Sequence, residues 1–281
     1  LKGFGPKKVE NMLRSLKLHK IIEDRIILWD AMQAGNRMTE LLLTLPTVKR
    51  VELAGSLRRR KETIGDLDIL AVVSPRDRKK VAEFFTGPKL AQKVLAKGDT
   101  RASILMTEDS KQADLRMVDE SEWGAALQYF TGSKEHNIHL RTIAKNQGYK
   151  ISEYGVFNIR SQKRIAGKTE NEIYDSLGMQ FVPPEMREDK GEVELALAHK
   201  LPQLVDLKDI RGDLQMHSDW SDGLYTLDEI VAYVQKNFRY DYIAMTDHSK
   251  SSRVAGGMDE KGFLKQIRAI NELNERIGTD F

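Results

Sequence analysis

Residues 54–70 read AGSLRRRKETIGDLDIL, and this stretch decides the fold around it. From Asp66 onward polar and apolar residues alternate, which predicts a β-strand with Asp66 and Asp68 on one face. Carboxylates at positions i and i+2 lie about 6.5–7 Å apart at the backbone, so their oxygens can converge on a hard cation such as Mg²⁺. An Asp-x-Asp pair by itself is also compatible with an exposed polar face.

The loop before this strand has the features of a phosphate site. Gly55 allows the backbone to approach a phosphate closely, and the hydroxyl of Ser56 can donate to it. Four consecutive cations at residues 58–61 add positive charge, and arginine can hold phosphate oxygens through two parallel hydrogen bonds. A phosphate-binding loop followed by paired carboxylates is the order needed to bring a nucleoside triphosphate to metal ions.

A third carboxylate is expected on a neighbouring strand. In the segment Asp114-Leu115-Arg116-Met117-Val118, alternation puts Asp114 and Arg116 on one face. Two metal ions held by such carboxylates can activate an attacking hydroxyl and stabilise a leaving pyrophosphate. Considered alone, Asp114 is also compatible with a surface position.

Four stretches of the chain differ in their patterning. Residues 1 to about 45 are predicted to be helical throughout, and Pro46 ends the last helix because the residue before a proline avoids the α region. The next stretch is predicted to contain strands at Val48 to Ala54, Asp66 to Val73, Ala102 to Met106 and Ala113 to Val118, and a helix at Arg76 to Phe85. Residues 119 to about 190 return to helix with short strands, and residues 211–281 follow the order β-α-β-α after a linker.

Composition restricts the class of protein. The 281 residues include no Cys, which excludes disulfides and thiolate metal sites and suits a reducing cytosol. No apolar run approaches the roughly 20 residues needed to cross a bilayer, so no membrane partner is expected. The net charge is +3, but residues 1–65 carry 14 Lys/Arg against 7 Asp/Glu, which fits polyphosphate binding as well as a solvated charged surface. We expect a cytoplasmic, nucleoid-associated monomer. Because the chain starts without Met and its last unit has few strands, we also expect a piece cut at both ends.

Several motifs resemble those of family X DNA polymerases. Gly55-Ser56-x-Arg58-Arg59 followed by Gly65-Asp66-Leu67-Asp68 resembles the nucleotidyltransferase motif of DNA polymerase beta and its relatives. Residues 129–141, YFTGSKEHNIHLR, look like the thumb signature of that family, and residues 148–154 follow at its spacing. The resemblance implies an α+β fold with helical fingers, a polymerase beta-like nucleotidyltransferase palm with a mixed sheet, and an α+β thumb.

The resemblance also implies a role for each matching position. Asp66 and Asp68 would ligate two Mg²⁺ ions (or Mn²⁺), and Asp114 would ligate the catalytic ion near the primer 3′-hydroxyl. The dNTP-binding positions would be Gly55, Ser56, Arg59 and Gly65 at the triphosphate, Tyr129, Phe130 and Gly132 at the deoxyribose, and Asn137 at the base. Arg141 would reach the template side, and Glu153 would help to set the closed thumb. Ordinary core aromatics are the alternative for the pair Tyr129 and Phe130.

Two flanking segments resemble further modules. Residues 3–8, GFGPKK, resemble a helix-hairpin-helix loop, in which Gly3, Gly5, Lys7 and Lys8 would bind DNA phosphates; a helix-entry turn is the alternative. Residues 212–223 and 246–249 resemble the start of a PHP phosphoesterase domain, a partial β/α barrel, with His217, Asp222 and His248 as candidate ligands of Mn or Zn. Such a site commonly opens with His-x-His, but here Gln215, a poorer transition-metal ligand, stands at the first position. Because the remaining ligands would lie beyond Phe281, no nuclease activity is expected of this chain.

These motifs in this order are the arrangement of bacterial and archaeal PolX enzymes. They divide the chain into helical fingers (1–45), palm (46–118), thumb (119–190), linker (191–210) and a truncated PHP domain (211–281). The predicted function is a template-directed DNA polymerase that adds dNMP to a primer 3′-hydroxyl, releases pyrophosphate and fills short gaps in DNA repair. Its partners would be gapped or primed DNA and dNTP. One alternative is a transferase that modifies a small molecule or an RNA end. A DNA-binding scaffold without metal chemistry is another.

Overall fold

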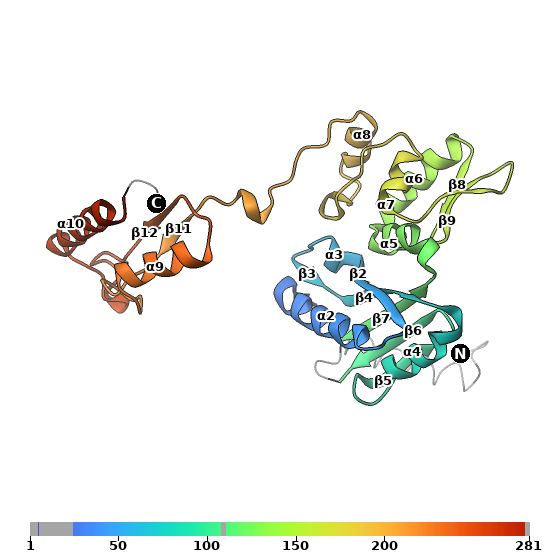
Figure 1. Ribbon diagram of the computed structural model, residues 1–281, viewed down its shortest axis with the longest axis horizontal. Coiled ribbons are helices and arrows are strands. Elements are labelled where there is room, and N and C mark those ends of the chain that lie inside the picture. Colours follow the sequence, from blue (N-terminus) through green and yellow to red (C-terminus); the bar gives the residue numbers. More distant parts are fainter. Residues whose placement is uncertain (1–4, 6–24, 108–110, 279–281) are drawn as a thin grey trace. The chain divides into compact units, whose positions relative to one another are not determined.

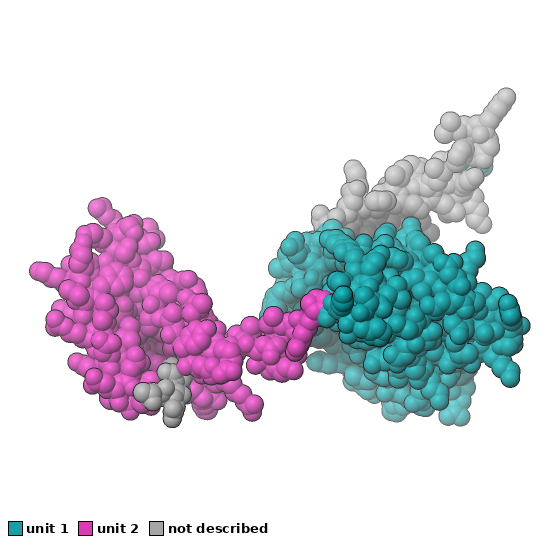
Figure 2. Space-filling view, turned by 90° about the horizontal axis from the view of Figure 1, so that it is seen from above, with its two compact units in different colours: residues 1–201 teal, residues 202–281 magenta. Residues whose placement is uncertain are grey.

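The computed structural model describes residue 5, residues 25–107 and residues 111–278, and the chain forms two compact units (Figure 1). Unit 1 comprises residues 1–201 and unit 2 comprises residues 202–281 (Figure 2). Each unit is built around its own apolar clusters, and each is considered separately below. None of the helices in the described part of the chain is both long enough and apolar enough to span a bilayer.

A five-stranded mixed sheet forms the centre of the palm in unit 1. Its strands, in spatial order, are β2 (Val48–Leu53), β4 (Asp66–Val73), β7 (Gln112–Val118), β6 (Arg101–Met106) and β5 (Ala91–Lys97). The central pair β4 and β7 is parallel, whereas the other neighbours are antiparallel. A second, two-stranded sheet joins β1 (Ile26–Ile27) to β3 (Thr63–Ile64).

The two faces of β4 have different neighbours because successive side chains of a strand point to opposite sides. Leu67 and Ile69 are buried in the cluster that also includes residues of α2 (Leu28–Leu43) and α4 (Arg78–Phe85). On the other face, Leu70 and Val72 pack against α5 (Trp123–Thr131). Asp66 and Asp68 share this second face at the start of the strand, and both are partly buried.

All four predicted palm strands and the helix near Arg76 are present. Four elements differ from the prediction: β1 lies in the expected helical stretch, α3 (Gly55–Arg58) and β3 form inside the expected loop, and β5 was not anticipated. Strand β5 lies at the sheet edge and carries Gln92, Lys93 and Lys97 among small apolar residues, so its sequence has no regular alternation. Strand β1 forms because two β-branched residues pair with β3, a contact between distant segments.

The thumb combines helices with a three-stranded sheet (Figure 1). Its helices are α5, α6 (Lys134–Asn146), α7 (Glu170–Asp175) and α8 (Glu192–Leu197), and its strands are β8 (Tyr149–Ser152), β9 (Gly155–Asn158) and β10 (Arg164–Ala166). Ser133 caps α6 by accepting a hydrogen bond from the backbone N–H of His136 at 3.2 Å. Helix α8 lies inside the segment expected to be a linker from residue 191, and its Val193 and Ala196 are buried in the thumb core.

Unit 2 has the predicted β-α-β-α order. Its parallel strands are β11 (Gly212–Met216) and β12 (Tyr242–Met245), and its helices are α9 (Leu227–Asn237) and α10 (Glu260–Ile277). A small core of Leu227, Val231 and Leu273 joins the two helices. Single 3-10 turns occur at Pro75–Asp77 and Glu120–Glu122, which lead directly into α4 and α5, and at Pro184–Met186, Leu207–Asp209 and Arg253–Ala255.

The contact between α5 and the start of α7 gives a test of the thumb packing. A Cβ on Gly124 would lie 2.1 Å from the backbone carbon of Thr169, and no side-chain rotation can relieve a clash with backbone. We predict that Gly124→Ala destabilises unit 1 by about 1–3 kcal/mol and lowers its melting temperature by roughly 2–10 °C in a thermal unfolding scan. The control is Gly98→Ala, where the nearest atom is 3.7 Å away. Equal melting temperatures for the two variants would contradict this packing.

Candidate functional site

Three carboxylates from two adjacent strands meet at one end of the palm sheet. Asp66 and Asp68 lie at the start of β4, and Asp114 lies on the parallel strand β7. The register places Asp68 opposite Asp114, and one oxygen from each of the three carboxylates lies within 4.8 Å of the others. The structure therefore brings together the three acidic residues that the sequence pattern singled out.

Without a cation this closeness is electrostatically unfavourable. Burial, and then the charges of Asp66 and Asp114, raise the pKa of Asp68 from 3.8 to about 7. Burial, and then Asp114, also raise the pKa of Asp66. The guanidinium groups of Arg59 and Arg116 oppose the shift in the pKa of Asp68 without cancelling it. Crowded carboxylate oxygens are the donor set that Mg²⁺ and Mn²⁺ prefer, so the residues present fit a divalent metal site.

Gly55 allows the preceding loop to lie directly against Asp68. Its φ of +57° is left-handed, and a Cβ there would lie 2.0 Å from Oδ2 of Asp68. The residue before Gly55 is held to the strand as well: the backbone N–H of Ala54 donates to the carbonyl oxygen of Asp68 at 2.8 Å. Ser56, partly buried, follows in the first turn of α3. Glycine is therefore required at position 55 to keep this loop beside the carboxylates.

Arg58 connects the palm loop to the thumb. Its guanidinium donates to the two carboxylate oxygens of Glu170 at 2.9 and 2.6 Å. Arg187, which is fully buried, donates to the same carboxylate at 2.6 Å. Burial alone would raise the pKa of Glu170, but the hydrogen bonds and charges of the two arginines hold it below its ordinary value. Arg58 is thus used inside the protein and adds little to the charge available for a phosphate.

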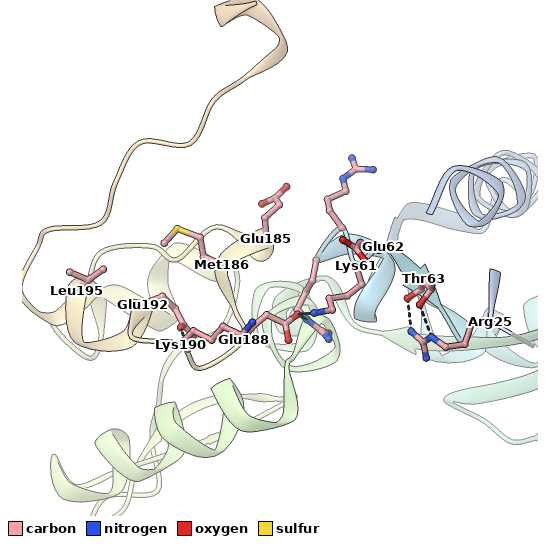
Figure 3. Close-up of a pocket in the computed structure, with 12 residues that line it drawn as sticks. Arg25, Lys61, Glu62, Thr63, Glu185, Met186, Glu188, Lys190, Glu192 and Leu195 are labelled. Atoms are coloured by element: carbon pink, nitrogen blue, oxygen red, sulfur yellow. Dashed lines mark hydrogen bonds and ion pairs between the residues drawn. The ribbon is translucent and has the colours of Figure 1, made fainter. Parts of the chain in front are cut away.

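Arg59 lies between the carboxylates and the thumb. Its Nε donates to Glu188 at 2.8 Å, and its Nη1 donates to the backbone carbonyl of Thr131 at 2.6 Å. The ammonium group of Lys61 lies 3.6 Å from the same Glu188 carboxylate (Figure 3). The same Nη1 of Arg59 also lies 3.2 Å from where a Cβ on Gly132 would be. Arg59 is therefore close to the predicted deoxyribose position and already paired with a carboxylate.

Arg25 is a cation near the carboxylates that the sequence patterns did not reveal. Its Nε donates to the hydroxyl of Thr63 at 2.8 Å (Figure 3), and its Nη1 lies 3.2 Å from where a Cβ on Gly65 would be. Its positive charge opposes the rise in the pKa of Asp66 that burial and Asp114 cause. Arg25 also lines an open cavity of about 640 Å³, together with Arg59, Arg60, Lys61 and residues of the 185–195 segment. Only the pairing of β1 with β3 brings Arg25 to this place.

The thumb residues predicted to contact the nucleotide lie at the end of α5 and the start of α6. The rings of Tyr129 and Phe130 meet edge to face with centroids 5.2 Å apart, and the guanidinium of Arg116 lies 4.9 Å above the Phe130 ring. Arg116 shares its strand face with Asp114, so Phe130 is near the carboxylates. The Asn137 side chain accepts from Nε2 of Gln128 at 2.8 Å and donates to the carbonyl of Tyr129 at 2.7 Å, which fixes its orientation.

The residues predicted to contact DNA or to close the thumb have no contact with the three carboxylates among those that the structure describes. Arg141 is exposed on α6 and donates to the backbone carbonyl of Asn137 at 3.2 Å. Glu153 lies in the turn between β8 and β9. Gly5 is exposed, whereas Gly3, Lys7 and Lys8 lie outside the described residues.

A second cluster of possible ligands lies in unit 2. One ligand atom each of His217, Asp222 and His248 lies within 4.8 Å of the others. His217 Nδ1 lies 2.7 Å from Asp222 Oδ1, and His248 Nε2 lies 3.4 Å from Asp222 Oδ2. The amide nitrogen of Gln215 lies 2.9 Å from His217 Nε2. Because an amide NH₂ only donates, this contact fits a neutral His217 with its proton on Nδ1.

The chain resembles known polymerases in both sequence and structure. Residues 126–188 match the family model described as DNA polymerase beta thumb. Over 278 residues the chain is 37% identical to the DNA polymerase/3′-5′ exonuclease PolX of Bacillus subtilis, covering 98% of this chain and 47% of that protein. Over 142 residues it is 28% identical to the repair DNA polymerase X of African swine fever virus, covering 50% of this chain and 82% of that protein. The chain thus spans about half the length of the Bacillus relative.

Among solved structures, a ternary complex of Leishmania infantum polymerase beta matches with a TM-score of 0.56 and 20% sequence identity. The match covers 67% of this chain and 95% of that one. The fold and the acidic palm therefore define a polymerase beta-like protein, which confirms the predicted α+β class. Taken with the sequence matches, the chain is similar to family X DNA polymerases over nearly its whole length. The PHP identity of unit 2 remains a prediction.

The raised pKa of Asp68 leads to a stability prediction for the metal-free protein. Because the folded pKa of about 7 exceeds the ordinary value of 3.8, the folded state binds the proton more tightly, so stability is lost as pH rises from about 4 to about 7. Asp68→Asn removes this charge. In EDTA at pH 8 we expect it to raise the melting temperature by roughly 2–6 °C, corresponding to about 1–2 kcal/mol, with little difference near pH 4.

The control for this experiment is Asp99→Asn, an exposed residue in the turn before β6. It should leave the melting temperature unchanged at both pH values. Added Mg²⁺ should raise the melting temperature of the parent protein more than it raises the melting temperature of the Asp68→Asn variant. If Asp68→Asn were destabilising in EDTA at pH 8, the carboxylates would not repel one another as the distances imply.

Proposed function

We propose that this chain is a template-directed DNA polymerase that adds dNMP to a primer 3′-hydroxyl with release of pyrophosphate, and that it fills short gaps in DNA repair. The observation that carries this function is the convergence of Asp66, Asp68 and Asp114 within 4.8 Å at one end of the palm sheet. A polymerase beta-type thumb follows directly in the chain, at residues 126–188. An acidic site beside such a thumb suits a reaction that joins a nucleotide to a long acceptor.

Asp66 and Asp68 would hold two divalent ions, and Asp114 would share the one near the primer terminus. Bound there, Mg²⁺ would lower the pKa of the attacking hydroxyl and neutralise charge on the leaving pyrophosphate. The chain's own contribution is to orient the three carboxylates and to place the α-phosphorus in line with the hydroxyl.

The triphosphate would lie along the loop that begins at Gly55. Ser56 would donate to a phosphate oxygen, and Gly55 and Gly65 would leave room for the phosphates beside the backbone. Arg59 would bind phosphate by exchanging its contact with Glu188. Arg25, beside Gly65, would add a further positive charge.

The sugar and base would be held by the thumb. Tyr129, Phe130 and Gly132 would pack against the deoxyribose and crowd a ribose 2′-hydroxyl. Asn137 would donate to the minor-groove edge of the incoming base, because its amide is already oriented by Gln128 and by the Tyr129 carbonyl. Its contact with the Tyr129 carbonyl would then be shared with the base.

DNA would contact residues outside this nucleotide pocket. Arg141, exposed on α6, would reach the template side, and Glu153 would help to set the closed thumb. Gly3, Gly5, Lys7 and Lys8 would bind a backbone phosphate in the manner of a helix-hairpin-helix loop. We propose that the polymerase is a monomer of the cytoplasm, associated with the nucleoid.

Unit 2 supports a narrower proposal. His217, Asp222 and His248 would hold one Mn or Zn ion, provided that His217 exchanges its contact with Gln215 for the metal. An amide at position 215 is a weaker ligand than imidazole, so the affinity should be lower than that of a complete His-x-His site.

The polymerase function can be tested by removing the third carboxylate. We predict that Asp114→Ala lowers dNTP incorporation on gapped DNA with Mg²⁺ by at least about a thousandfold, roughly 4 kcal/mol of transition-state stabilisation. DNA affinity should stay close to that of the parent, because this residue is expected to act on the metal and not on the DNA backbone. The measurement is single-turnover primer extension, with DNA binding followed by fluorescence anisotropy.

The matched control is Asp99→Ala, an exposed acidic residue in the turn before β6, which should incorporate dNTP normally. Near-normal incorporation by Asp114→Ala would refute the assignment. Product made equally well without a template would favour the alternative transferase that modifies a small molecule or an RNA end.

A further inference from the structure

Ser103 lies directly behind the third carboxylate of the palm. It belongs to β6, and the antiparallel register places it opposite Asp114 on β7. Its side chain is 2% exposed, and its hydroxyl donates to Oδ1 of Asp114. A serine so deeply buried cannot contact DNA or nucleotide directly, so any influence on the reaction must act through Asp114.

The direction of the Ser103 hydroxyl hydrogen is determined by its other neighbour. Nε of Arg101 donates to the Ser103 oxygen at 3.3 Å, and because a guanidinium can only donate, the serine oxygen is the acceptor there. The single hydroxyl hydrogen is thus left for Asp114. A chain of two hydrogen bonds runs from Arg101 through Ser103 to the carboxylate.

The second oxygen of Asp114 is held as well. Nε2 of Gln112, which precedes Asp114 by two residues on the same strand face, donates to Oδ2 at 2.6 Å. Each carboxylate oxygen can accept two hydrogen bonds or ligands. Oδ1 also has an ion-pair partner, because Nη2 of Arg101 lies 3.6 Å from it. Ser103 and Gln112 each hold one oxygen and so fix the carboxylate plane, while Oδ2 retains a lone pair that a metal can use.

We propose that Ser103 is a positioning residue, which orients Asp114 for the metal near the primer terminus. This role rests on the proposed polymerase function. Residues that hold a metal ligand from behind affect both affinity and rate, because a ligand free to rotate must be reordered whenever the metal binds. Loss of the Ser103 hydroxyl should therefore weaken binding of the metal near the primer. It should affect dNTP binding much less, because the nucleotide would be bound by the metals at Asp66 and Asp68 and by the Gly55 loop.

The test compares Ser103→Ala, which removes the hydroxyl, with Ser103→Thr, which keeps it. On gapped DNA, Ser103→Ala is expected to lower kcat by about 10–100-fold and to raise the Mg²⁺ concentration needed for half-maximal rate. The KM for dNTP should change by less than about threefold, because nucleotide binding is unaffected. Ser103→Thr should recover most of kcat. Ser121→Ala, an exposed serine in the turn before α5, is the control and should behave like the parent.

Two measurements do not depend on activity. The first is thermal unfolding in EDTA, which should show that Ser103→Ala and Ser103→Thr are folded. The second is Mn²⁺ binding, measured by electron paramagnetic resonance. The Mn²⁺ titration uses complexes with dNTP and a dideoxy-terminated primer. Ser103→Ala should bind one of its Mn²⁺ ions about tenfold more weakly than the parent.

Parent-like kcat, Mg²⁺ response and Mn²⁺ affinity in Ser103→Ala would overturn the positioning role. The positioning role would also be overturned if Ser103→Ala lost kcat and dNTP affinity equally and Ser103→Thr did not restore them. Such a result would indicate a general packing defect. If the parent protein itself incorporated no dNTP, the polymerase function would fail, while the Mn²⁺ titration would still report whether Ser103 supports Asp114.

Discussion

Mutual repulsion among three carboxylates is the interaction on which the site depends. The parallel pairing of β4 with β7 places Asp68 opposite Asp114, and Asp66 joins them from two residues away. Like charges facing each other across a strand pair are destabilising, and here burial makes them more so. The arrangement persists because the same two strands bury Leu67, Ile69 and Leu115 on their opposite face. The palm core thus offsets the electrostatic cost of the acidic cluster.

The surrounding cations have separate tasks. Arg58 is held by Glu170 inside the contact between palm and thumb, and Arg187 makes that contact stronger. Arg59 donates to the Glu188 carboxylate and to the Thr131 carbonyl, and it lines an open cavity. A run of four adjacent cations therefore contains two neighbours that both contact the thumb, one through Glu170 and one through Glu188. The loop after Gly55 and the thumb are coupled through these two arginines.

Local features of this site could be predicted from sequence, because they depend on residues close together in the chain. The shared face of Asp66 and Asp68 follows from strand alternation. Gly55 was predicted as a point of close backbone approach to a phosphate, whereas the structure shows that the Asp68 carboxylate itself leaves no room for a Cβ there. The third carboxylate required an assumption about which strands are neighbours. That assumption was correct for β7, whose alternation is as regular as that of β4.

Partners that come from distant segments could not be predicted in this way. Arg25 reaches Asp66 only through the pairing of β1 with β3, and Ser103 reaches Asp114 only through the register of β6. Ser103 also looks like an ordinary strand residue in a sequence, since nothing in its neighbours signals a polar contact. The linker boundary was misplaced for a related reason: α8 is short and charged, and its two buried positions are recognisable only once the thumb core is known.

The most direct test of the acidic centre is a crystal structure with Mn²⁺, a primed template and an incoming dNTP, recorded so that anomalous scattering locates the metal. Two neighbouring anomalous peaks should lie between Asp66 and Asp68, with Asp114 contacting the one nearer the primer terminus. Peaks elsewhere in the palm, or none while dNTP is clearly bound, would contradict the assignment of these three residues as the metal ligands.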